Sequence, residues 1–165
     1  YAGERFGITP AEATLAFIAW AVGGLIGSVP AGLAGSRWGR RRSMLVGIVC
    51  LTVVQAALHF TPSMDASIPL VVAASFFWSF PTVNAFPLVI EPMRRESRGV
   101  FSAIFFLCMA LGGLAGDPLN GVVFEWMGTR RWLFALMAVY TAAACVAVLC
   151  IPKGAGEADT GPAPR

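Results

Sequence analysis

The chain has 165 residues, of which 57% are hydrophobic and only 13% are charged, and its mean hydropathy is +0.72. This composition excludes an ordinary soluble domain of this length and predicts an integral membrane protein. The formal net charge of +3 is small, and the arginines gather between apolar runs, so nothing indicates nucleic-acid binding. The four cysteines lie within apolar runs, without a Cys-x-x-Cys pair or clustered histidines, so neither a disulfide framework, a metal site nor a cofactor is indicated.

Five apolar runs are separated by charged segments, and each is close to the roughly 20 residues that a helix needs to cross a bilayer. The runs are continuous and show no alternation, which favours helices over strands and makes the predicted fold all-α. Prolines 81 and 87 predict a kink in the third run. We expect a lead-in at residues 1–10, a five-helix transmembrane bundle at 11–151 and a disordered cytoplasmic tail at 152–165, with spans at about 11–34, 43–60, 68–90, 100–124 and 132–151.

The stretch from Gly32 to Arg42 contains four arginines within six residues, and such a density cannot enter hydrocarbon. Arginine-rich turns mark the cytoplasmic side of a membrane protein. A second basic loop, residues 93–98, follows after one pair of spans and therefore lies on the same side. Nine lysines and arginines fall on this side and three on the other. The charge pattern predicts an N-terminus outside and a C-terminus in the cytoplasm, in a plasma membrane or a bacterial inner membrane.

The same basic stretch resembles the loop signature of the major facilitator superfamily of transporters, Gly-x-x-x-Asp-Arg-x-Gly-Arg-Arg. Five positions match, and Ser36 stands where the family has its acidic residue; the matching residues are Gly32, Arg37, Gly39, Arg40 and Arg41. The resemblance covers nearly the whole chain and implies five transmembrane helices of a six-helix repeat. The segment from Glu91 to Gly99, the glycine-rich fourth span and the terminal tail favour the C-terminal half.

The resemblance implies a secondary active transporter, or a fragment of one, that moves a small solute across a membrane by alternating access. Because one helix of the repeat is absent, we expect the missing six-helix half to lie upstream in the same chain or in a partner chain. The expected surroundings are a lipid bilayer, and no covalent chemistry is implied, so the protein is not expected to be an enzyme. The alternative is a transport-dead membrane scaffold or assembly protein of the same fold, which the loss of the signature acid at Ser36 favours.

Glu91 and Arg98 flank the second basic loop. In the family the signature acid pairs with an arginine that opens a later helix, a position that Arg98 fills here, and Glu91 matches the acid that ends the preceding span. Because Ser36 carries no charge, we expect Glu91 to act as a gating latch with Arg98, or with Arg37. The alternative is that the arginines only set the topology.

Polar residues inside the spans are costly in lipid and are candidates for a solute or proton pathway. Asp117 and Asn120 are three residues apart on one helix and are expected to share a face. They either couple transport to a proton or solute, or cap the outer end of the helix. Trp78 and Asn84, in the third span, either line a solute cavity or pack between helices.

Small residues recur at four-residue spacing in two spans, where they allow helix backbones to approach closely. The pairs are Gly23 with Gly27 in the first span and Gly112 with Gly116 in the fourth. The family arrangement implies that these two spans face the partner half, so we expect these glycines to mediate helix packing there.

Overall fold

The computed structural model describes residues 6, 7 and 9–151, and the described part contains helices and no strand. The all-α prediction is therefore confirmed. Residues 1–5, half of the expected lead-in, and 152–165, the expected tail, lie outside the described residues together with residue 8. The elements in chain order are α2 (Pro10–Trp38), α3 (Arg40–His59), α4 (Met64–Ile90), the short 3₁₀ helix η1 (Arg95–Ser97), α5 (Arg98–Met127) and α6 (Leu133–Leu149).

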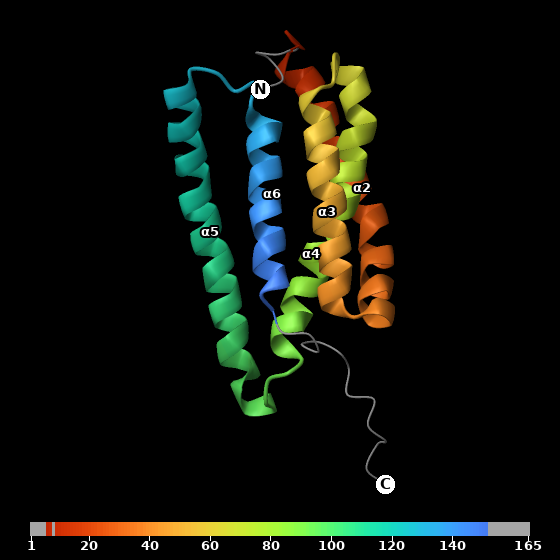
Figure 1. Cartoon of the computed structure of the whole chain (residues 1–165), viewed down its shortest axis with the longest axis vertical. Coiled ribbons are helices and arrows are strands. Elements are labelled where there is room, and N and C mark those ends of the chain that lie inside the picture. Colours follow the sequence, from red (N-terminus) through yellow and green to blue (C-terminus); the bar gives the residue numbers. More distant parts are fainter. Residues whose placement is uncertain (1–5, 8, 152–165) are drawn as a thin grey trace.

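Four of these helices are long and apolar enough to cross a membrane: α2, α3, α4 and α5 with its preceding turn. The fifth, α6, is also apolar but has 17 residues, which is the lower end of the length that spans hydrocarbon. Figure 1 shows the helices as an elongated bundle, with α5 standing at one side. We call the end of the bundle that holds Gly39 and η1 the turn end, and the end that holds Phe60 and Gly128 the far end.

The α4 helix packs against both α2 and α3. Its contact with α2 is close because an added Cβ atom at Gly23 would lie 2.2 Å from the Val72 carbonyl oxygen, and one at Gly27 would lie 2.6 Å from the Phe76 carbonyl oxygen. The small residues of the first span thus bring two backbones together, as their spacing predicts. Their neighbour is α4 of the same chain, however, and not a partner half.

A polar seam joins α3 to α6. The Thr52 hydroxyl donates to the Thr141 hydroxyl at 3.0 Å, and the Thr141 hydroxyl lies 2.8 Å from the Gln55 side-chain oxygen. Gln55 is buried. Polar side chains in lipid are stabilised when they hydrogen-bond across helices, so this seam holds α6 on α3.

The basic turn is shorter than the sequence suggests. Residues 35–38 and 40–42, expected to be a loop between spans, are helical, and only Gly39 interrupts the helices, with a φ of 86°. Helical backbone satisfies its own hydrogen bonds, and the long arginine side chains still reach water from a helix end. Glycine is required at the break because a residue with a Cβ atom is strained at this φ.

The α5 helix is the least covered of the four long helices, since no residue of it is buried by the described part of the chain. Near the turn end, Phe86 of α4 packs against Phe105 and Phe106, with ring centroids 5.3 and 5.4 Å apart. Further along, Cβ atoms added at Gly112 and Gly116 would meet no atom of the described chain within 4 Å. The small-residue face of α5 therefore has no neighbour among the described helices.

Candidate functional site: an arginine and a carboxylate at the turn end

The centre of the site is an ion pair between Arg40, the first residue of α3, and Glu91, which directly follows α4. The Arg40 Nε donates to both Glu91 carboxylate oxygens at 2.9 Å, and its Nη2 also contacts Oε1. The Arg40 side chain is 22% exposed and the Glu91 side chain 44% exposed. The pair is thus reachable by water, which weakens its Coulomb attraction.

Each charge of this pair lies at the unfavourable end of its own helix. A cation at a helix N-terminus and an anion at a C-terminus oppose the helix dipole. The charges of Arg40 and Glu91 are stabilised by each other, whereas neither is stabilised by the dipole of its own helix. The two charges therefore stabilise the contact between the two helix ends and do not stabilise either helix by itself.

Asn84 lies on α4, seven residues before Glu91, and its side chain is 0% exposed. Its side-chain nitrogen donates to the Phe80 carbonyl at 2.9 Å, to the Ala31 carbonyl at 3.0 Å and to the Ser43 hydroxyl at 3.2 Å. Its side-chain oxygen accepts from Arg40 Nη1 at 3.4 Å. Asn84 thus contacts α2 and α3 at once, and in this conformation it offers no exposed atom to a solute.

Two members of this network could not be assigned from the sequence. Ser43 is 0% exposed and is held 3.5 Å from the Ala31 carbonyl oxygen. Gly35 is buried where an added Cβ atom would lie 1.8 Å from the Asn84 side-chain oxygen. Both residues lie in or beside the basic stretch. The one sequence signal that pointed to them was Asn84 itself, because a polar side chain within a span needs hydrogen-bonding partners on the neighbouring helices.

The other signature residues take different places. Arg41 donates to the Leu149 carbonyl at 2.9 Å and to the Val148 carbonyl at 3.3 Å, so it caps the end of α6. Arg37 is exposed. At Gly32 an added Cβ atom would meet only Val83, at 3.9 Å, which is an ordinary contact. Ser36 is exposed, and its hydroxyl donates to the Leu33 carbonyl at 3.0 Å.

Glu91 has a different partner from the expected one. The Arg98 Nε donates to the Met93 carbonyl at 3.2 Å, within its own loop, while Glu91 is bound by Arg40. The reason is local: Arg98 opens α5 after η1 and its guanidinium turns back along the loop, whereas Arg40 is half-buried against the end of α4. The expected pairing of Glu91 with Arg98 or Arg37 is not the one the structure contains.

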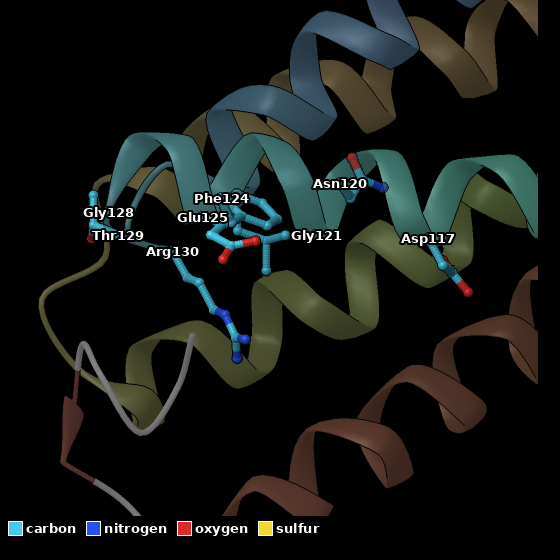
Figure 2. A pocket seen from close by; sticks show the side chains of 9 residues that line it. Asp117, Asn120, Gly121, Phe124, Glu125, Gly128, Thr129 and Arg130 are labelled. Carbon is cyan, nitrogen blue, oxygen red and sulfur yellow. The ribbon is translucent and has the colours of Figure 1, made fainter.

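A hollow of about 740 Å³ lies near the far end, lined by the last turns of α5, the loop that follows and the start of α6. Asp117 is exposed and Asn120 half-buried on its α5 wall. Figure 2 shows these two side chains pointing in different directions, with Asp117 at the opposite end of the lining from Gly128 and Thr129. Both residues nevertheless line the same hollow, and their expected joint role stays a prediction.

Trp78 lies in the middle part of α4 and is 44% exposed. It thus offers a large ring to whatever covers that face of α4. Within the described residues, no group of three or more His, Cys, Asp or Glu side chains is arranged to hold a metal ion. What the described site contains is a charge pair that joins two helix ends.

Comparisons with known proteins agree with this architecture. The family model described as Major Facilitator Superfamily matches residues 1–164. Two relatives named "MFS-type transporter ppzB", from Metarhizium majus (strain ARSEF 297) and Metarhizium rileyi (strain RCEF 4871), are each 30% identical over 143 residues. The match covers 84% of this chain and 31% and 29% of the two relatives, so the chain spans about three-tenths of their length. No solved structure gives a significant match. The match over almost the entire chain, joined to the bundle and the basic turn described above, makes this chain a member of the major facilitator superfamily.

Proposed function

We propose that this chain is part of a secondary active transporter that moves a small solute across a membrane by alternating access. The family match and the transporter names of the two Metarhizium relatives support transport. The observation that carries the proposal is the Arg40 and Glu91 pair, which ties the start of α3 to the end of α4. In this proposal no covalent bond is made or broken, and the work is done by a change of conformation.

The pair acts as a latch because its strength suits a reversible contact. An ion pair of this exposure contributes under about 1 kcal/mol. A free-energy change of that size alters the ratio of two conformations by up to about fivefold, without unfolding either. The latch therefore biases the turn end towards the closed state, and a bound solute can still open it.

The uncovered face of α5 supports the proposal that the rest of the transporter packs against this helix. Gly112 and Gly116 lie on a helix that the described chain leaves unburied, and small residues allow a second backbone to approach. We propose that the missing six-helix half covers this face, and that the chain belongs to the C-terminal half. The arginine count favours a turn end in the cytoplasm of a plasma membrane or a bacterial inner membrane.

Solute or proton recognition is proposed for Trp78, Asp117 and Asn120. Trp78 is exposed on α4, and Asp117 is an exposed carboxylate about two-thirds of the way along α5. An ionisable group within a span is costly unless it faces a cavity or a partner. Asn84 is better explained as a structural residue of the latch, because its polar atoms are already engaged.

A transport-dead scaffold of the same fold is the competing proposal. It is favoured by Ser36, whose hydroxyl is turned to its own helix and adds no charge to the basic turn. A scaffold needs one stable conformation, whereas a transporter must exchange between two. The two proposals therefore differ in whether weakening the latch changes the conformation.

The test uses the complete gene product, reconstituted in lipid, with its native cysteines replaced. Thr82 is exposed on α4, two residues before Asn84, so we use the modification rate of Thr82→Cys as the measure of access to the turn end from water. With N-ethylmaleimide as the probe, Glu91→Gln should raise its modification rate by up to about fivefold. An unchanged rate in a protein that folds normally would favour the scaffold.

A further inference from the structure

We infer that Asn84 is a positioning residue that couples the packing of α2 on α4 to the Arg40 and Glu91 pair. Its contacts reach two other helices, α2 and α3, and one of these contacts is made to the arginine itself. Asn84 thus makes the strength of the latch depend on where α2 lies. The inference rests on the proposed function in that it takes the latch to be the gating contact.

The orientation of the Asn84 amide is fixed by its surroundings. An asparagine side chain has two N–H donors and one oxygen acceptor. The nitrogen lies within 3.2 Å of two carbonyl oxygens and one hydroxyl, which have to accept or share those donors. Reversing the amide would place its oxygen against the carbonyl oxygens of Ala31 and Phe80. The oxygen therefore points towards Arg40 and accepts from Nη1, while Glu91 binds Nε and Nη2 of the same guanidinium.

The position of α2 decides whether this orientation is available. The Ala31 carbonyl oxygen that receives the Asn84 donor belongs to α2, and Gly35, one turn later, leaves the space that the Asn84 oxygen occupies. A Cβ atom at position 35 would lie 1.8 Å from that oxygen and 2.8 Å from the Asn84 Cγ. A shift of α2 along α4 would consequently remove the acceptor from Arg40 Nη1. The arginine would then be held by Glu91 alone, across an exposed surface.

The inference separates two roles that a buried asparagine could have. If Asn84 only holds helices together, replacing it lowers stability regardless of Glu91. If it acts through Arg40, part of its effect disappears once Glu91 is neutralised, because the arginine no longer has a carboxylate to be positioned against. Residues that share a partner show such non-additive effects, whereas independent residues do not.

The experiment measures the distance between the two sides of the latch in the complete gene product in lipid. Spin labels are attached to cysteines at Arg42 and Glu96, which are exposed on α3 and η1, in a background without the native cysteines. The population with the short distance reports the closed latch. This measurement needs no solute, so it stands even if the protein proves not to transport.

Asn84→Leu and Gly35→Ala both disrupt the contact between Asn84 and Arg40, the first from α4 and the second from α2. Each should reduce the ratio of closed to open latch by about fivefold, as expected for the loss of one hydrogen bond of typical strength. Gly99→Ala is the control, because its added Cβ would meet nothing within 4 Å, and it should leave the distances unchanged. In a Glu91→Gln background, Asn84→Leu should change the ratio by less than twofold.

Two results would overturn the inference. One is an unchanged distance distribution in both Asn84→Leu and Gly35→Ala. The other is an Asn84→Leu effect of the same size with and without Glu91, which would make Asn84 a packing residue only. If Asn84→Leu fails to fold, Gly35→Ala in the two backgrounds gives the same comparison.

Discussion

The contact between α2 and α4 leads to a sharp prediction at Gly27. Its added Cβ atom would lie 2.6 Å from the Phe76 carbonyl oxygen and 2.9 Å from the Phe76 Cα, both of which are backbone atoms of α4. Backbone cannot move aside as the end of a flexible side chain can, so α2 and α4 would have to separate. Overpacking of this kind typically costs about 1–3 kcal/mol.

Gly27→Ala should therefore destabilise the protein measurably. The assay is thermal unfolding of the complete gene product in detergent micelles, followed by loss of the monodisperse species. The matched control is Gly99→Ala, the same substitution in a helix where the new methyl group meets nothing within 4 Å. Gly27→Ala should unfold at a clearly lower temperature than Gly99→Ala. Equal unfolding temperatures would refute the close approach of α2 and α4.

Three further predictions concern the turn end, the orientation and the uncovered helix. Ser36→Asp places a carboxylate among exposed arginines at the turn end, so it should lower the N-ethylmaleimide reactivity of Thr82→Cys. Ser36→Ala is the control and should not lower it. Equal reactivity in the two variants would contradict a charge effect. A cysteine at Asp65 should react with an impermeant reagent in intact cells while one at Arg42 does not, and the reverse result would invert the topology. Gly116→Leu should leave the described helices folded but reduce assembly with the remaining helices, and normal assembly would show that this face meets lipid.

The helices themselves could be predicted from the sequence because apolar runs of membrane-spanning length leave few alternatives. Their ends were less predictable. The basic residues from Arg37 to Arg42 read as a loop, yet a helix whose arginine side chains reach water keeps its backbone bonded, and only Gly39 is needed to turn. At the start of α4, Ser63 accepts from the Ala66 amide and sets the first turn four residues before the expected span.

The site was predicted in part. Arg40, Glu91 and Asn84 were all singled out, but their mutual contacts were not, because pairing depends on which helix ends meet. Arg98 is close to Glu91 in sequence and satisfies a carbonyl of its own loop, whereas Arg40, 51 residues away, lies beside the carboxylate. The role of Gly35 depends on the position of one amide oxygen of α4, which no sequence pattern encodes.

In the proposed mechanism the turn end and the far end open in alternation, so the accessibility of one cysteine at each end should change in opposite directions. Thr82→Cys reports the turn end. Gly121→Cys reports the far end, because Gly121 lines the far-end hollow and a Cβ atom added there would meet nothing within 4 Å. In the complete gene product in lipid, Glu91→Gln should raise the modification rate at position 82 and lower it at position 121. Rates that rise together, or that do not change at either position, would contradict alternating access governed by the Arg40 and Glu91 pair.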